Sequence, residues 1–235
     1  SGIKTSRAII SVSNKKGLIN FTKHLLSNKY TIYSTGGTLS HLNQVISKPS
    51  NNLIFNVNRI SCFPEILGGR VKTLHPSIIG GILADVKDNN HLHDINQHNI
   101  SNFNLVVANL YPFCQRQAEI ERRFSHASKF RKMVASSIDE DSNEMESEII
   151  ENIDIGGHTM IRSAAKNFKN VSVLVEPAQY CEYINRENNG KITYEYRRTL
   201  AAYAMSYIDC YDRGVAQWFN PQTKWISLEK IRSPC

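Results

Sequence analysis

The stretch RAIISV, Arg7–Val12, decides the fold, because it is an apolar, β-branched run that ends at a polar cluster. Directly after that cluster, in Gly17–Ser27, apolar side chains recur at the spacing of one helix face. A buried strand followed at once by an amphipathic helix is the first half of a βαβ unit. Such units build a parallel sheet through right-handed crossovers.

The same alternation continues along the chain. Further strands are expected at Tyr30–Tyr33, Leu53–Val57, Ile78–Leu83, Leu105–Leu110 and Val171–Val175. Helices are expected at Thr38–Gln44, from Asp154 to about Lys166, and at Tyr194–Phe219. The pattern predicts an α/β fold with an open, mostly parallel sheet and helices on both faces. One domain would span residues 7–219, with a loop insertion at 114–148 and a tail at 220–235.

Composition narrows the class of protein. The chain has 235 residues, of which 41% are hydrophobic, so it can bury a sizeable core. No apolar run approaches the roughly 18 residues that a membrane helix needs, so no membrane partner is expected. The five cysteines are scattered and form no CxxC pair. This pattern favours a reducing compartment, the cytoplasm, over a disulfide-bonded secreted domain.

The net charge of +7 raises the question of nucleic-acid binding. Six basic residues lie between Arg116 and Lys132, and an acidic stretch follows from Asp139 to Glu151. A basic block beside an acidic block is typical of a solvated loop, and the segment has no zinc-finger spacing or RNA-binding aromatic motif. A polyanionic small molecule explains the charge equally well, so no nucleic-acid partner is expected.

Two clusters that follow predicted strands suit a phosphate group. Ser13–Gly17 offers a hydroxyl, the charge of Lys15 and the N–H groups that begin a helix. Ser34–Thr38 contains two glycines, which let an anion approach the backbone, and hydroxyl donors. The second cluster matches neither GxxxxGK[ST] nor GxGxxG, which argues against ATP or a dinucleotide. Each cluster could instead be a helix cap or a turn.

A third cluster, Gly68–Pro76, places Arg70 and Lys72 two residues apart. In an extended segment the two side chains would project from one face, where an anion between them would offset their repulsion. A solvated surface loop is the alternative.

Two further clusters contain groups that could act on a ring. Asn109–Phe113 follows a predicted strand and supplies amide and phenol groups for hydrogen bonding to a base. Asp154–Gly157 begins a helix, and Asp154 is either its N-cap or a carboxylate for proton transfer. In an open α/β sheet ligands bind beyond the carboxyl ends of the strands, so the five clusters are expected to converge on one crevice.

The histidine and cysteine residues give little support for a metal site or a thiol nucleophile. His91, His93 and His98 lie in a polar segment without the ligand spacing of a firm helix, so no metal is expected. Cys62 and Cys181 have no adjacent base and are expected to be packed thiols. No cofactor is expected.

Taken in order, the clusters resemble the cyclohydrolase domain of the bifunctional enzymes that pair aminoimidazole-carboxamide ribonucleotide transformylase with inosine monophosphate cyclohydrolase. The motifs that carry the resemblance are SVSxKxGL at Ser11–Leu18, SxGGT at Ser34–Thr38, FPEILGGRVKTLHP at Phe63–Pro76, NLYPF at Asn109–Phe113, and DIGG with RSAAKN at Asp154–Asn167. The resemblance runs from about Arg7 to about Phe219. It implies a methylglyoxal-synthase-like fold and a homodimer.

The resemblance also implies roles for individual residues. A phosphorylated purine-precursor ribonucleotide would be held at Ser13, Lys15, Gly17, Ser34, Gly36, Gly37, Thr38, Arg70, Thr73, Asn109, Ile155, Gly156 and Gly157. The residues nearest the closing ring would be Lys72, Tyr111, Asp154 and Lys166. In the implied reaction the carboxamide nitrogen attacks the neighbouring formyl carbon and water leaves. Asp154 would accept a proton with Lys166 as its partner, while Lys72 and Tyr111 stabilise the oxyanion.

The chain departs from the family pattern in three places. Residues 114–148 form a linker roughly twenty residues longer than the usual one, which favours a lid or a disordered excursion. Lys16 and His158 stand where small or apolar residues are usual. No transformylase sequence follows Phe219, so that domain is expected outside this chain, unless the protein is naturally monofunctional.

One assignment is geometrically awkward. If Gly156 to Lys166 form a straight helix, its ends lie about 15 Å apart at about 1.5 Å per residue. Lys166 then reaches Asp154 only if the helix bends, if the Asp154 loop folds back, or if Lys166 serves a neighbouring subunit. The alternative functions are a nucleotide sensor that does no chemistry on the same fold and, on charge alone, an RNA-binding module.

Overall fold

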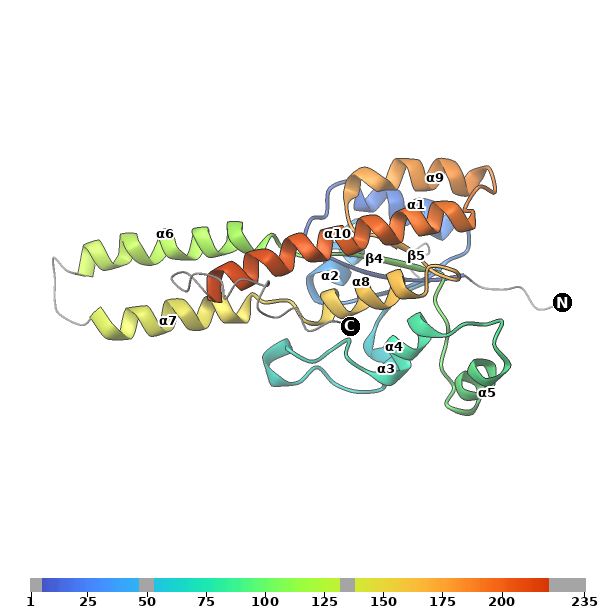
Figure 1. Cartoon of the computed structure of the whole chain (residues 1–235), viewed down its shortest axis with the longest axis horizontal. Coiled ribbons are helices and arrows are strands. Elements are labelled where there is room, and N and C mark those ends of the chain that lie inside the picture. The colour runs from blue at the N-terminus through green and yellow to red at the C-terminus, as the bar shows by residue number, and fades with distance from the viewer. Residues whose placement is uncertain (1–5, 47–52, 132–137, 220–235) are drawn as a thin grey trace, which may run out of the picture. The chain divides into compact units, whose positions relative to one another are not determined.

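The computed structural model describes residues 6–46, 53–131 and 138–219, so the predicted tail lies outside the described part (Figure 1). Five parallel strands form one sheet in the order β3-β2-β1-β4-β5. The strands are β1 (Arg7–Val12), β2 (Thr31–Ser34), β3 (Ile54–Asn56), β4 (Leu105–Asn109) and β5 (Ser172–Leu174). The helices are α1 (Leu18–Ser27), α2 (Gly36–Val45), α3 (Asn58–Ser61), η2 (Leu67–Gly69), α4 (Pro76–Leu83), α5 (Asn89–Gln97), α6 (Phe113–Arg131), α7 (Ile138–Glu151), α8 (Gly156–Lys166), η3 (Pro177–Gln179), α9 (Tyr180–Asn188) and α10 (Tyr194–Phe219).

The described residues group into two compact units. The first comprises Ser1–Tyr111 and Asp154–Ile208, and the second comprises Pro112–Ile153 and Asp209–Cys235. The sheet belongs to the first unit, and its strand β4, between β1 and β5, is buried at every position. Among the described helices, none is long and apolar enough to cross a membrane.

The order of the strands explains how the helices cover the sheet. The chain moves outward from β1 through β2 to β3, returns to the other side of β1 with β4, and continues to β5. Because βαβ crossovers are right-handed, this reversal sends helices to opposite faces. Accordingly α1 packs on α9, while α4 packs on α8 beneath β4 and β5 (Figure 1). The predicted fold class is therefore confirmed.

The prediction of a strand at Ile78–Leu83 is wrong, because these residues belong to helix α4. Pro76 occupies the first turn, and His75 caps it by accepting a hydrogen bond from the amide of Ser77. The buried residues are Ile78, Gly81 and Ile82, which is the spacing of one helix face. A short apolar run does not distinguish a strand from a buried helix, which is why the sequence misleads here.

The expectation that residues 114–148 form a loop is also wrong, because helices α6 and α7 fill most of this segment. That the segment is an insertion relative to the family stays a prediction. The two helices pack against each other within the second unit. Their blocks of opposite charge meet: Glu148 on α7 forms ion pairs with Arg116 and Arg123 on α6. The basic and acidic blocks that suggested a solvated loop instead form ion pairs between two packed helices.

His91 and His93 lie on helix α5, which Asp88 caps by accepting hydrogen bonds from the amides of Asn90 and His91. One smaller expectation is wrong. Cys62 and Cys181 are exposed and not packed in the core.

Candidate functional site

The reversal of strand order places β1 beside β4, and their carboxyl ends are joined by one side chain. The Oδ1 of Asn109, the last residue of β4, accepts hydrogen bonds from the amides of Ser13 at 2.8 Å and Asn14 at 2.9 Å. Its Nδ2 donates to the carbonyl of Asn14 at 3.3 Å. Ligands of open α/β sheets bind at this kind of reversal, so the candidate site has its centre here. Asn109 acts there as a clamp on the loop after β1.

The hydroxyls of Ser34 and Thr38 hold the backbone of β1. Ser34 Oγ donates to the carbonyl of Ile10 at 2.7 Å, and Thr38 Oγ1 both accepts from the amide and donates to the carbonyl of Val12 at 3.0 Å. Both side chains are buried. In this structure the hydroxyl protons of both side chains are thus directed to β1 carbonyls, and their predicted binding to a phosphate stays a prediction. What remains open is the start of α2, because a Cβ on Gly36 or Gly37 would meet nothing within 4 Å.

The loop after β1 does not contain the serine-capped helix start that was the alternative interpretation of Ser13–Gly17. The N-cap of α1 is Gly17, with φ of 70°, so no side chain of the N-cap residue bonds to the amides of the first turn. Lys15 is part-exposed, with its Nζ 3.5 Å from the carbonyl of Ser13. The loop thus leaves the Lys15 ammonium near the backbone that Asn109 holds.

The segment with Arg70 and Lys72 is a tight turn and not the expected extended strand. Leu67, Gly68 and Gly69 all have positive φ, and the turn is closed by paired hydrogen bonds between Ile66 and Val71. Arg70 has helical dihedrals, which removes the alternation that would align it with Lys72.

Lys72 has a carboxylate partner that the sequence analysis missed. Its Nζ lies 3.8 Å from Glu65 Oε1, and both side chains are roughly half exposed. An exposed pair of this kind is worth at most about 1 kcal/mol, so a ligand anion can displace Glu65 at small cost. The signal for it was present in the sequence as a carboxylate seven residues before Lys72 in the same motif.

The start of α8 is packed against two other site elements. A Cβ on Gly156 would lie 2.5 Å from Thr73 Oγ1, and a Cβ on Gly157 would lie 2.8 Å from Leu110 Cδ2. Asp154 Oδ1 accepts a hydrogen bond from the amide of Gly157 at 2.7 Å. The carboxylate of Asp154 therefore caps α8 while it remains exposed at the edge of the sheet.

This close approach gives a first prediction. Gly156→Ala should lower the free energy of unfolding by about 1–3 kcal/mol, because the added methyl group overlaps Thr73, which is buried and short. Gly37→Ala is the matched control, since Gly37 also lies in the first turn of a helix but faces open space. We expect it to change stability by less than about 1 kcal/mol. Urea unfolding measures both, and equal losses would contradict the packing argument.

The remaining expected residues lie on either side of this cluster. Tyr111 lies two residues after the end of β4 and is 41% exposed, and Ile155 precedes α8 and is 55% exposed. Both apolar surfaces are thus accessible to a ligand at the edge of the sheet.

Lys166 lies at the far end of α8. The helix is continuous from Gly156 to Lys166, so its ends are separated by about 15 Å. Beyond it, Asn167 donates to the carbonyls of Ile82 and Ala84, and the amide of Ser172 donates to the carbonyl of Asn104, just before β4. Lys166 therefore faces the amino edge of the sheet, opposite Asp154, and the bent-helix explanation is removed.

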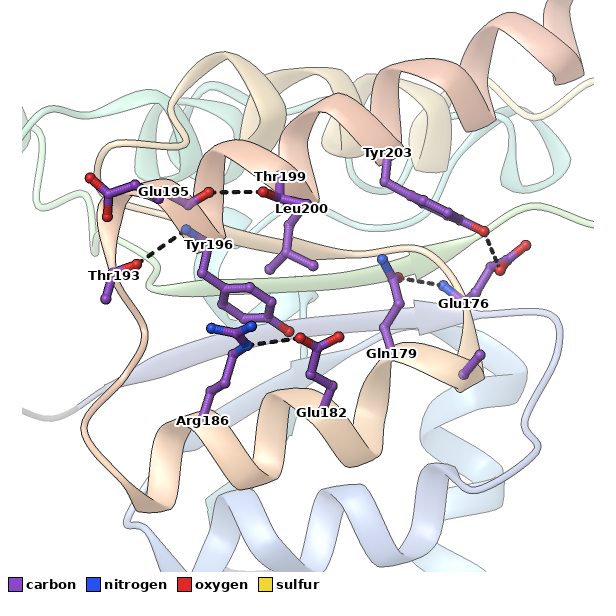
Figure 2. A pocket seen from close by; sticks show the side chains of 11 residues that line it. Glu176, Gln179, Glu182, Arg186, Thr193, Glu195, Tyr196, Thr199, Leu200 and Tyr203 are labelled. Carbon is purple, nitrogen blue, oxygen red and sulfur yellow. Dashed lines mark hydrogen bonds and ion pairs between the residues drawn. The ribbon is translucent and has the colours of Figure 1, made fainter.

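A separate groove of about 420 Å³ lies between α9 and α10 (Figure 2). Arg186 forms an ion pair with Glu182 at 2.8 Å and stacks on the ring of Tyr196 at 4.2 Å. Burial, and then the charge of Glu182, raise the pKa of Tyr196 to about 12. Among the described residues, none of those expected in the site lines this groove. Nor does any group of three or more metal-ligating side chains occur in that part of the chain.

Comparison with known proteins agrees with the geometry. The profile of the MGS-like domain matches residues 17–159, and that of the AICARFT/IMPCHase bienzyme matches residues 164–233. The solved structure of ForH superposes with a TM-score of 0.71 at 26% identity and covers 92% of this chain and 100% of ForH.

Curated relatives named bifunctional purine biosynthesis protein PurH are also similar. The protein from Staphylococcus epidermidis is 38% identical over 91% of this chain and 38% of its own length. The protein from Caldicellulosiruptor saccharolyticus is 42% identical over 92% of this chain and 37% of its own length. The chain thus spans about two fifths of the length of these relatives. With a family profile that matches more than half of its residues and a parallel sheet of the expected topology, the chain belongs to the MGS-like domain family.

Proposed function

We propose that this chain is an inosine monophosphate cyclohydrolase of purine biosynthesis. One observation carries the proposal: the loops after β1 and β4, the turn that ends at Thr73 and the start of α8 meet at the carboxyl edge of the sheet. The similarity to PurH and to the AICARFT/IMPCHase bienzyme supports the choice of substrate. The substrate would be formylated aminoimidazole-carboxamide ribonucleotide.

The phosphate would bind where backbone amides are accessible. The start of α2 at Gly36 and Gly37 is open, and the ammonium of Lys15 lies near the adjoining loop. A helix start attracts anions through its unpaired N–H groups and its dipole. Ser34 and Thr38 would contribute indirectly, because their hydroxyls hold β1 and thereby place these loops.

Ring closure needs a proton acceptor and stabilisation of a developing oxyanion. The carboxamide nitrogen attacks the formyl carbon, one N–H proton leaves, and loss of water then completes the ring. Asp154 would accept the proton, since the amide of Gly157 holds its carboxylate at the edge of the sheet. Lys72 and Tyr111 would stabilise the oxyanion. Both reacting groups sit on one ring, so the site chiefly selects the reactive rotamer.

Assembly and surroundings follow from the same proposal. We propose a homodimer in which Lys166 serves the site of the neighbouring subunit, and a transformylase domain as a functional partner of this domain. The exposed thiols among the described residues fit a reducing compartment, for which we propose the cytoplasm.

The direct test is incubation with the formylated nucleotide while ultraviolet absorbance reports the formation of inosine monophosphate. Turnover without added metal or cofactor is expected. If the absorbance does not change although the nucleotide binds tightly, the chain is a nucleotide sensor on the same fold and not an enzyme.

The helical hairpin of the second unit should be dispensable for this activity. Replacing residues 124–146 by a short glycine-serine linker should leave kcat and KM within about twofold, because closing a short loop costs little. The ion pair between Arg123 and Glu148 shows that the two ends to be joined lie close together. Steady-state kinetics of the deletion variant measure this. A tenfold loss of substrate affinity would mean that the hairpin acts as a lid.

A further inference from the structure

The hydroxyl of Tyr207 on α10 forms hydrogen bonds with both backbone polar groups of Leu110, the residue that follows β4. The amide of Leu110 donates to Tyr207 Oη at 2.9 Å, and the same hydroxyl donates to the carbonyl of Leu110 at 3.0 Å. The two residues are 97 positions apart in the sequence. A single phenol thus pairs with both backbone groups of one residue, as a neighbouring strand would.

Leu110 lies where the sheet stops supporting β4. The ladder with β1 ends at the pair Val12 and Asn109, and the ladder with β5 ends at Val107 and Leu174. Leu110 is nevertheless buried, with 3% of its surface exposed. A buried backbone group without a partner costs about 1–3 kcal/mol, so the Tyr207 hydroxyl extends the ordered part of β4 by one residue.

This one residue adjoins three parts of the candidate site. Before it stands Asn109, which holds the loop of Ser13 and Asn14. After it stands Tyr111, the proposed oxyanion-stabilising phenol. Its side chain lies against Gly157, whose amide holds Asp154. A shift of the Leu110 backbone would therefore move groups on both sides of the reacting ring.

We propose that Tyr207 is a positioning residue of the cyclohydrolase site, which fixes the end of β4 and through it Tyr111. The inference rests on the proposed function. In this role Tyr207 acts through Leu110 and not by contact with the substrate. Displacements of about 1 Å in a catalytic group commonly cost up to about a hundredfold in rate, so even a modest relaxation of β4 should be measurable.

The chain offers a matched control one helical turn earlier. Tyr203 lies four residues before Tyr207 on α10, and its hydroxyl donates to Glu176, which follows the edge strand β5 (Figure 2). Tyr203→Phe removes the same atom from the same face of the same helix. Its hydrogen bond, however, leads to the groove between α9 and α10 and not to Leu110.

Two measurements on Tyr207→Phe and Tyr203→Phe test the inference. Native-state hydrogen exchange should show the Leu110 amide exchanging about tenfold faster in Tyr207→Phe and unchanged in Tyr203→Phe. In steady-state kinetics well below the unfolding transition, Tyr207→Phe should lower kcat about tenfold with KM within about twofold, while Tyr203→Phe changes neither. Titration of nucleotide-binding sites corrects kcat for any inactive fraction.

Each other outcome has a definite meaning. Faster exchange at Leu110 with unchanged kcat overturns the inference, because the hydrogen bonds would then position nothing that matters to the reaction. An equal fall of kcat in both variants also overturns it, since the effect would come from loosening α10 in general. Wild-type protein without turnover overturns the proposed function, whereas active wild type with equally active Tyr207→Phe overturns this inference alone.

Discussion

Lys72→Ala is expected to lower kcat by about a hundredfold or more while the protein stays folded. The loss of one charged or polar donor at a developing oxyanion commonly has an effect of about this size. Folding should persist because Lys72 is part-exposed and its described ion pair, with Glu65, is a weak surface pair. The ultraviolet assay measures kcat and KM, and thermal unfolding verifies that the variant is folded.

Two variants in the same turn make the result specific. Glu65→Gln removes the partner of Lys72 but keeps the ammonium, so it should leave most of kcat. Arg70→Ala removes a cation from the same loop and is expected to raise KM more than it lowers kcat, as for a phosphate contact. If Lys72→Ala instead raises KM with kcat nearly unchanged, Lys72 is a phosphate clamp and its proposed role at the oxyanion is wrong.

The sequence predicted the sheet well because its inner strands β1 and β4 are apolar runs that are buried at most or all positions. The predicted strand Arg7–Val12 and the predicted helix Tyr194–Phe219 match the observed bounds. The other confirmed strands differ from their predicted bounds by at most one residue at each end. The convergence of polar clusters at one edge also followed from parallel strand order alone. These features depend on local periodicity and on chain topology, which a single sequence contains.

Several features that the sequence did not reveal depend on contacts between distant residues. The hydroxyls of Ser34 and Thr38 bond to carbonyls of β1, which only the register of the sheet brings near. In the pair of helices α6 and α7, Glu148 of one helix meets arginines of the other. Tyr207 was predicted as part of a helix, but its partner Leu110 lies 97 residues away.

The most demanding expectation concerns Lys166. Asp154 and Lys166 stand at opposite ends of one unbroken helix, about 15 Å apart, whereas a lysine side chain spans only about 6 Å. Within one chain Lys166 therefore does not reach Asp154, so its proposed assistance requires that the α8 end of one subunit lie at the site of another. In a dimer with two-fold symmetry, each of the two sites would then combine Asp154 of one chain with Lys166 of the other.

Complementation between two inactive variants distinguishes a site shared between two subunits from a site in which Lys166 takes no part. Asp154→Asn and Lys166→Met should each lose about a hundredfold or more in kcat as homodimers. In a heterodimer purified through two different tags, a shared site would unite the intact Asp154 of one chain with the intact Lys166 of the other. The second site would carry both lesions. Activity should therefore recover to about half of the wild-type value per dimer, because one of two symmetric sites is complete.

The control pairs Asp154→Asn with Lys72→Ala, since both groups are proposed to act within one subunit. No site in that heterodimer is intact, so no recovery is expected. Recovery in the control would mean that Lys72 also crosses the boundary, and the turn that carries it would then serve the neighbouring site. If the Asp154→Asn and Lys166→Met heterodimer stays inactive while it binds nucleotide normally, Lys166 does not complete the site from the partner. Since α8 is too long for contact within one subunit, Lys166 would then no longer be a catalytic candidate.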